Sequence, residues 1–290
     1  MANIKKYTYK KDLVYLNVDG ENIIIKPKKC YNLDKIYKYL DDHDINSYLR
    51  PIEINDHQVI FKELEKTSLN DDELAKRLIY NLALWQNKTT SYVPLDLDKV
   101  KEIYEKHIKE LNFLYAYYHD LQDMIEMKVY MHPSEYLYIR NVSYIYSALN
   151  YARHLLDEWY QKITKTTTIR EVYCHGKCEL SHFLGNDNGY FISLENAHLG
   201  SPVEDFLHFY NQDFEKVDMF STFHFYQHKY PFKEEEKLYF YFSIVIPRMI
   251  DIYPSSLNKC TELVKFYDQI KKTSQFISEN KEKKEHHQHN

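Results

Sequence analysis

The sequence predicts an α+β fold with a small β-rich N-terminal part and a larger helical C-terminal part. Three observations lead to this prediction. Short runs of β-branched and aromatic residues fill the first 66 positions. After residue 70 the apolar spacing changes to the period of an amphipathic helix. The chain also has only five glycines in 290 residues, so no stretch of the N-terminal part can form a glycine-rich phosphate loop.

The strand signals come first along the chain. Residues 13–18 and 23–26 flank Asp19-Gly20, a turn pair typical of a tight hairpin. Asn32 is placed to cap a short helix over residues 33–40. Two further strands are predicted at residues 51–54 and 58–64, separated by Asn55-Asp56.

Helical periodicity then continues to about residue 278. The first helix, from Asp71, has an apolar stripe of Leu74, Leu78, Leu82 and Trp85. Two long helices are predicted at residues 94–129 and 135–163, separated by a break at His132-Pro133-Ser134. Further helices are expected at residues 206–209, 214–226, 233–252 and 257–278. The charged tail, residues 279–290, shows no periodicity and is expected to be disordered.

Composition excludes several classes of protein. A net charge of −5 and a pI near 6.3, without a dense basic patch, argue against nucleic-acid binding. No apolar run reaches the roughly 18–20 residues that span a bilayer. The N-terminus has no hydrophobic signal-peptide core, so we expect a cytoplasmic protein. Four scattered cysteines are too few for a disulfide framework.

One stretch, residues 172–205, concentrates the side chains that can do chemistry. An apolar strand ends at His175-Gly176. A hairpin signal, Asn186-Asp-Asn-Gly189, then leads to Ile192-Ser-Leu-Glu195 and to Gly200-Ser-Pro-Val-Glu-Asp205.

This stretch resembles the catalytic core of the aminoglycoside phosphotransferase and choline kinase-like superfamily. That pattern has His-Gly-Asp-x-x-x-x-Asn, then Ile-Asp-Phe/Trp-Glu, then Gly-x-Pro-x-x-Asp. Three chemical positions depart from it. Lys177 stands in place of the catalytic Asp, His182 in place of the metal-binding Asn, and Ser193 in place of the second metal-binding Asp. The matching residues are His175, Gly176, Glu195, Gly200, Pro202 and Asp205.

The resemblance implies a bilobal protein-kinase-like fold. Its small β-rich N-lobe would cover residues 1–66, and its helical C-lobe residues 67–278, with the degenerate loop at 172–205. The segment from Leu82 to Thr89 is similar to the turn that closes the equivalent family helix, with Trp85 and Gln86 in place of a Leu and a His. The Tyr- and Lys-rich helical region is similar to the spore-coat branch of this superfamily.

The resemblance also implies roles for single residues. Lys26 falls where the family carries its ATP-anchoring lysine, although an exposed strand lysine is the alternative. Glu195 would lie beside the nucleotide cleft. His175 and Gly176 would shape the loop, and Asp205 would accept hydrogen bonds from the loop backbone.

The substitutions predict a catalytically dead, pseudokinase-type protein. Phosphoryl transfer needs carboxylates that hold Mg²⁺ and an Asp that orients the attacking hydroxyl. The ammonium of Lys177 would repel a metal, while His182 and Ser193 are poor Mg²⁺ ligands. We therefore expect no cofactor and no metal, and a binding or scaffold role with a protein partner or a second copy. The alternative is an active phosphotransferase that uses ATP and Mg²⁺ with Glu179 or Glu195 as relocated acids.

Two other sites are compatible with the residues of the loop. Cys174, His175, Cys178 and His182 have a spacing at which zinc could be bound, but adjacent ligands with opposed side-chain directions argue against it. The pairs Cys174 with His175 and Cys178 with His182 could supply a nucleophile and a base. However, the sequence identifies neither an orienting partner nor an oxyanion site.

Overall fold

The computed structural model describes residues 4–10, 13–18, 20–30, 32–64, 67–185, 189–253 and 255–288. The chain falls into two compact units. Unit 1 combines residues 1–92 with 170–231, and unit 2 combines residues 93–169 with 232–290. Residues 172–205, here called the motif loop, fall in the same unit as the N-terminal segment, so this division differs from the expected boundary at residue 66.

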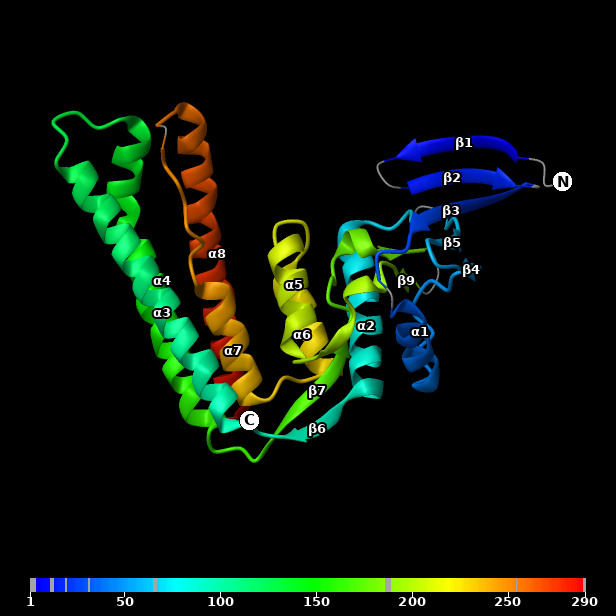
Figure 1. The fold of residues 1–290 in the computed structure, drawn as a ribbon. Coiled ribbons are helices and arrows are strands. Elements are labelled where there is room, and N and C mark those ends of the chain that lie inside the picture. Colours follow the sequence, from blue (N-terminus) through cyan, green and yellow to red (C-terminus); the bar gives the residue numbers. More distant parts are fainter. Residues whose placement is uncertain are drawn as a thin grey trace. The chain divides into compact units, whose positions relative to one another are not determined.

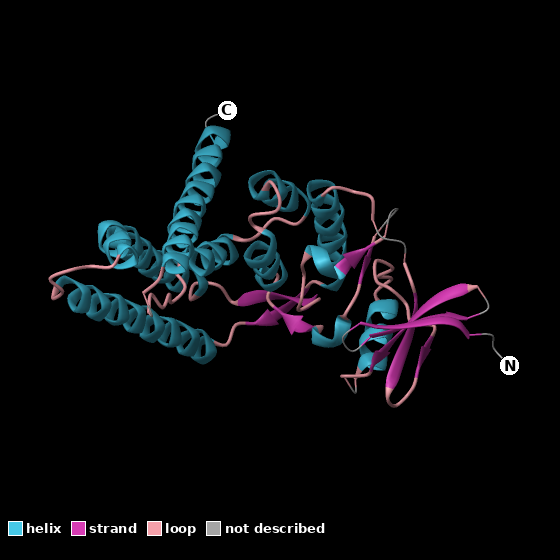
Figure 2. Ribbon diagram, turned by 90° about the horizontal axis from the view of Figure 1, so that it is seen from above, coloured by secondary structure: helices cyan, strands magenta, loops and turns pink. Residues whose placement is uncertain are grey.

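Unit 1 contains a five-stranded antiparallel sheet (Figures 1 and 2). Gly20, at φ +93°, lies in the predicted turn between the second and third strands, while Asp19 lies outside the described residues. The sheet order is β1-β2-β3-β5-β4, formed by β1 (Ile4–Lys10), β2 (Leu13–Val18), β3 (Glu21–Pro27), β4 (Glu53–Ile54) and β5 (Gln58–Lys62). Helix α1 (Leu33–Asp42) follows Asn32, but the Asn32 side chain makes no capping hydrogen bond, contrary to expectation.

Helix α2 (Asp71–Thr89) is the main helix beneath the motif loop. Asn70 and Glu73 form a reciprocal capping box at its start, which satisfies two otherwise unpaired backbone N–H groups. The predicted stripe is confirmed, because Leu74, Leu78, Leu82 and Trp85 are all buried. Helix α2 packs against α6 (Met219–Lys229), which follows α5 (Val203–Asp213).

Short strands frame the motif loop. Strand β7 (Thr168–Cys174) pairs with β10 (His198–Gly200), and β6 (Ser91–Pro94) completes that sheet. Strands β8 (Phe183–Leu184) and β9 (Tyr190–Phe191) form the predicted hairpin, with Phe183 opposite Phe191. Most of the predicted turn, residues 186–188, lies outside the described residues. Single helical turns η1 (Leu180–His182) and η2 (Leu194–Asn196) precede β8 and β10.

Unit 2 is helical, with α3 (Leu97–Glu126), α4 (Pro133–Ile163), α7 (Glu234–Val245) and α8 (Leu257–Gln288). Its core is tied by tyrosine hydroxyls that donate to backbone carbonyls. Tyr267 donates to Tyr138 O at 3.2 Å, Tyr138 to Tyr118 O at 2.8 Å, and Tyr118 to Arg248 O at 2.5 Å. Tyrosine therefore acts here as a core residue whose polar end is paired. No helix among the described residues is both long and apolar enough to cross a membrane.

Two helical predictions in this unit are corrected. The single helix expected over residues 233–252 ends at Val245, because Pro247 favours an extended conformation at Ile246 (ψ 119°). At the C-terminus, α8 continues to Gln288, so the segment expected to be disordered from residue 279 is helical as far as the structure describes it.

Candidate functional site

The turn after β7 is held by one buried carboxylate. Asp205 Oδ2 accepts from the backbone N–H of His175 at 2.8 Å, and Oδ1 accepts from that of Gly176 at 2.9 Å. Burial raises the pKa of Asp205 to about 6, against these two hydrogen bonds, which lower it. Gly176 has φ +75°, and a Cβ there would lie 2.2 Å from the carbonyl oxygen of Asn196. The turn therefore requires glycine and depends on Asp205.

His175 is a neutral, fully engaged side chain beneath the turn. Its Nε2 donates to Ile192 O at 2.9 Å, and its Nδ1 accepts from the backbone N–H of Lys177 at 3.3 Å. Burial lowers the pKa of His175 to about 4, so the ring stays uncharged at neutral pH. With both nitrogens used, His175 is not available as a zinc ligand or as a general base for Cys174.

Trp85 and Gln86 of α2 both donate hydrogen bonds to the motif loop. Trp85 Nε1 donates to Tyr173 O at 2.6 Å, and its ring meets the His175 ring edge-on with centroids 6.3 Å apart. Gln86 Nε2 donates to Pro202 O at 3.0 Å. Helix α2 is therefore hydrogen-bonded near both ends of the motif loop.

Lys26 of β3 contacts two residues of the motif loop. Its Nζ lies 3.2 Å from Ser193 Oγ and forms an ion pair with the carboxylate of Glu195. Ser193 itself has a left-handed backbone, φ +64°, at the start of η2. Burial raises the pKa of Glu195, but the hydrogen bond and charge of Lys26 outweigh it, so the net shift is downward. Lys26, Ser193 and Glu195 thus form one cluster.

Two positive charges lie near His182. Its Nδ1 is 3.1 Å from Lys177 O, and the side chain is mostly buried. Burial lowers the pKa of His182, and the nearby charges of Lys177 and Lys26 lower it further. The three positions Lys177, His182 and Lys26 are therefore electrostatically coupled.

Glu179, one of the two possible relocated acids, is a mostly buried side chain with several partners. Its side chain is 16% exposed, accepts from Ser181 Oγ, and lies 3.6 Å from His182 Nδ1 and 3.5 Å from His208 Nε2. Burial raises its pKa, while Ser181 and the two histidines lower it to a net downward shift. The sequence did not predict the contact between Glu179 and His208, because His208 lies on α5, 29 positions after Glu179.

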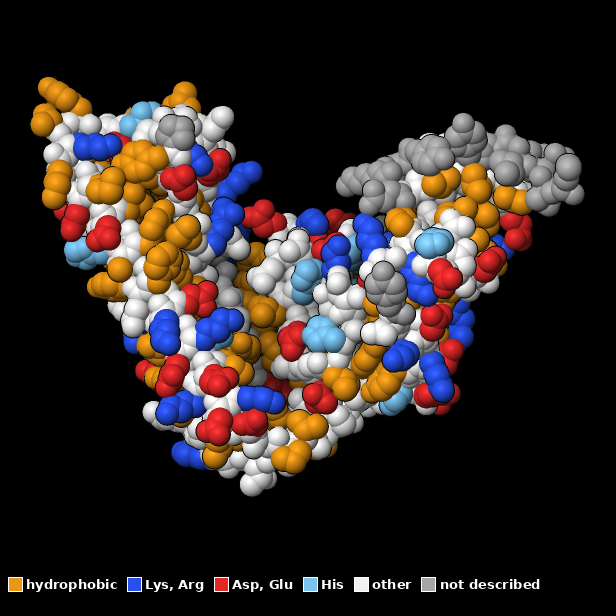
Figure 3. Space-filling model, viewed as in Figure 1, with side chains coloured by type: hydrophobic (Ala, Val, Ile, Leu, Met, Phe, Trp, Pro, Cys, Tyr) orange, Lys and Arg blue, Asp and Glu red, His pale blue; other side chains and the backbone are white. Residues whose placement is uncertain are grey.

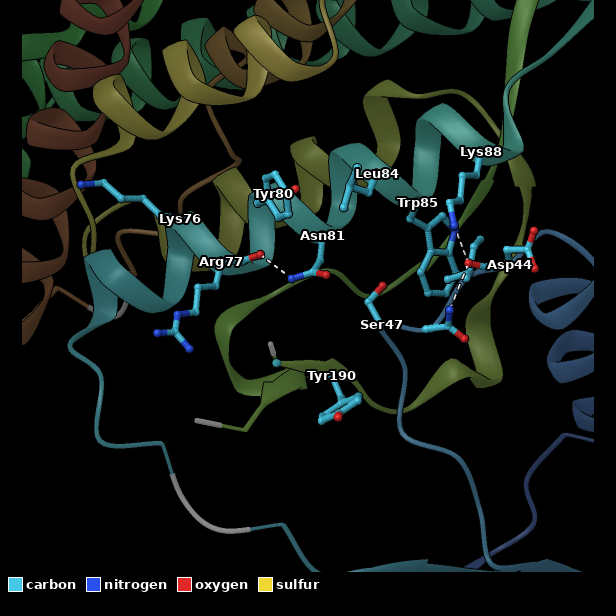
Figure 4. A pocket seen from close by; sticks show the side chains of 13 residues that line it. Asp44, Ser47, Lys76, Arg77, Tyr80, Asn81, Leu84, Trp85, Lys88 and Tyr190 are labelled. Atoms are coloured by element: carbon cyan, nitrogen blue, oxygen red, sulfur yellow. Dashed lines mark hydrogen bonds between the residues drawn. The ribbon is translucent and has the colours of Figure 1, made fainter. Parts of the chain in front are cut away.

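A pocket of about 610 Å³ has Trp85 among its lining residues (Figure 4). Figure 4 shows Asp44 and Ser47 facing α2, with Lys88 Nζ donating to Asp44 O at 2.5 Å. Asn81 turns back to donate to Arg77 O at 2.9 Å. The sequence did not reveal this pocket, because its walls come from three segments that are distant along the chain.

Neither protein-family models nor curated proteins match the sequence. Solved structures do resemble this one. An aminoglycoside phosphotransferase from Alicyclobacillus acidocaldarius gives a TM-score of 0.73 at 11% identity, covering 98% of this chain and 93% of that one. A spectinomycin phosphotransferase bound to AMP gives 0.54 at 13% identity, covering 92% and 90%. The predicted fold class is confirmed: the chain has the α+β kinase-like fold of these phosphotransferases.

Proposed function

We propose that this chain is a kinase-fold binding or scaffold module that lacks magnesium-dependent phosphotransferase activity. The observation that carries the proposal is the Lys26 cluster. Lys26, which corresponds in the motif resemblance to the ATP-anchoring lysine, already pairs with Glu195 and contacts Ser193 Oγ at 3.2 Å. A triphosphate would have to share the Lys26 ammonium with the negatively charged carboxylate of Glu195.

The chemistry of the neighbouring positions supports the same proposal. Mg²⁺ prefers hard oxygen ligands in octahedral geometry, and it is held in kinases by carboxylate and amide side chains. Here the corresponding positions carry His182 and Ser193, and Lys177 adds a positive charge that already disfavours protonation of His182. A divalent cation would meet the same repulsion.

The alternative function is phosphoryl transfer with relocated acids, since the two structural neighbours described above are phosphotransferases. Glu195 would have to leave Lys26, and Glu179 would have to leave Ser181 and its two histidines. Each carboxylate is thus committed to a local partner.

A binding role has a candidate surface in unit 2. The turn between α3 and α4 exposes Met127, Val129 and Tyr130 at 84%, 87% and 90%. Figure 3 shows hydrophobic side chains gathered at this end of the two helices, at the upper left. Exposed apolar groups of this kind usually mark partner sites, and Met and Tyr are common in interfaces. A protein partner or a second copy is proposed; a role in a spore coat rests on the sequence resemblance alone.

The test of the nucleotide proposal is thermal unfolding of the full chain with ATP, and with ATP plus Mg²⁺. A ligand at 100 times its Kd adds about 2.7 kcal/mol to the free energy of unfolding, which is readily seen as a higher Tm. We expect no shift in either condition. A shift that requires Mg²⁺, together with ATP turnover that falls in Glu179→Gln or Glu195→Gln, would overturn the proposal in favour of the enzyme.

A further inference from the structure

The candidate lies at the back of the motif loop, where β7, β10 and the start of α5 meet. Cys174 and His198 are directly opposed in the antiparallel pair formed by β7 and β10. Directly opposed residues of such a pair present their side chains to the same face. Glu204, in the first turn of α5, reaches the same place, with Oε2 2.9 Å from His198 Nε2.

We propose that Cys174, His198 and Glu204 form a binding site for a thiophilic divalent cation, Zn²⁺ in the first instance. The three ligand atoms lie within 4.8 Å of one another. In a tetrahedral zinc site with bonds of about 2.0–2.3 Å, donor atoms are about 3.3–3.8 Å apart. Closing the cluster around a cation therefore requires movements of about an ångström, which the exposed side chains of His198 and Glu204 permit.

The two exposed ligands are already oriented. His198 Nδ1 donates to Asn196 O at 2.8 Å, and Nε2 donates to Glu204 Oε2 at 2.9 Å, so a cation would take the place of the Nε2 hydrogen between these two ligands. Glu204 Oε1 accepts from the backbone N–H of Ser201 at 2.8 Å, which aims Oε2 at the cluster. Hydrogen bonds of this kind commonly hold histidine and carboxylate ligands in place at metal sites.

The donor set selects the metal. A thiolate with an imidazole and a carboxylate suits a borderline ion such as Zn²⁺, whereas Mg²⁺ and Ca²⁺ prefer oxygen alone. On binding, the Cys174 thiol gives up its hydrogen bond to Ser201 O, 3.4 Å away, and releases its proton to solvent, and His198 releases the Nε2 proton that it shares with Glu204. The cation then joins three protein ligands and keeps a fourth position for water.

Such a site would link the residues that directly precede His175 and Asp205, which form the motif turn. Cys174 precedes His175, and Glu204 precedes Asp205, whose carboxylate accepts from His175 and Gly176. A bound cation would thereby fix the turn, and it does not depend on whether the chain transfers phosphate.

The test uses Co²⁺ as a spectroscopic probe for the full-length, fully reduced chain. One equivalent is expected to produce a thiolate-to-cobalt charge-transfer band and tetrahedral d–d absorption, both removed by Zn²⁺. Cys174→Ser should abolish the charge-transfer band, and His198→Gln and Glu204→Gln should each weaken apparent Co²⁺ affinity at least tenfold. Because His198 and Glu204 are exposed, their variants are expected to keep the fold, which circular dichroism checks.

Cys30→Ser and Cys260→Ser are the matched controls, since both cysteines are partly exposed and lie outside the cluster. They should leave the band unchanged. The proposal is overturned if the wild-type chain gives no charge-transfer band. It is equally overturned if the band survives in Cys174→Ser, or if His198→Gln and Glu204→Gln bind Co²⁺ as tightly as the wild type.

Discussion

Replacement of Gly176 by alanine tests the geometry of the motif turn directly. At φ +75° an alanine carries the left-handed backbone penalty of about 1–2 kcal/mol. Its Cβ would also lie 2.2 Å from Asn196 O, a backbone atom that cannot swing aside. Overpacking of this kind adds about 1–3 kcal/mol. We therefore expect Gly176→Ala to lower the free energy of unfolding by about 2–5 kcal/mol in total.

Gly20→Ala is the matched control. Gly20 has φ +93°, but a Cβ there would have nothing within 4 Å. Only the backbone penalty of about 1–2 kcal/mol should remain. The difference between the two variants isolates the clash with Asn196.

Urea unfolding followed by tryptophan fluorescence is the assay. The chain has two tryptophans, Trp85 in unit 1 and Trp159 in unit 2, so a Trp159→Phe background leaves Trp85 as the reporter beside the turn. If Gly176→Ala and Gly20→Ala shift the transition equally, the close approach between residues 176 and 196 is wrong.

Three further predictions follow from the same contacts. Because burial lowers the pKa of His175 from 6.5 to about 4, the unfolded chain takes up a proton that the folded chain does not. Wild-type stability relative to His175→Asn should thus fall by up to about 3 kcal/mol as pH drops from 6.5 to 4; parallel pH profiles would contradict this. Trp85→Phe should cost about 1–3 kcal/mol by circular dichroism, since it removes the 2.6 Å bond to Tyr173 O; an unchanged urea midpoint would count against that contact. If the α3–α4 turn mediates self-association, Val129→Asp should lower the mass seen by light scattering while Ile52→Asp, another exposed apolar site, leaves it unchanged; equal effects would exclude the turn.

The parts of the site that could be predicted are local in sequence. The roles of His175, Gly176 and Asp205 in the turn were expected from the family resemblance, and α2 from a regular apolar stripe. The end of α7 was mispredicted because the apolar run past residue 245 outweighed Pro247, although the proline was visible in the sequence.

The parts that could not be predicted depend on contacts between distant segments. The resemblance placed Lys26 and Glu195 at the same nucleotide cleft, but their ion pair joins residues 169 positions apart and depends on how β3 packs on residues 172–205. The zinc alternative grouped Cys174 with His175, Cys178 and His182 by their spacing, and the adjacency of Cys174 and His175 already argued against it. Successive residues of a strand point to opposite faces, so Cys174 meets His198 and Glu204 instead.

The central claim, that substituted side chains prevent Mg²⁺-dependent nucleotide binding, is tested most directly by restoring them. Lys177→Asp, His182→Asn and Ser193→Asp would be combined in one chain, and ATP binding measured by titration calorimetry with and without Mg²⁺. The wild type should show no Mg²⁺-dependent binding, whereas the restored chain, shown by circular dichroism to be folded, should gain it. Mg²⁺-dependent ATP binding by the wild type, or a folded restored chain that still does not bind, would contradict the account.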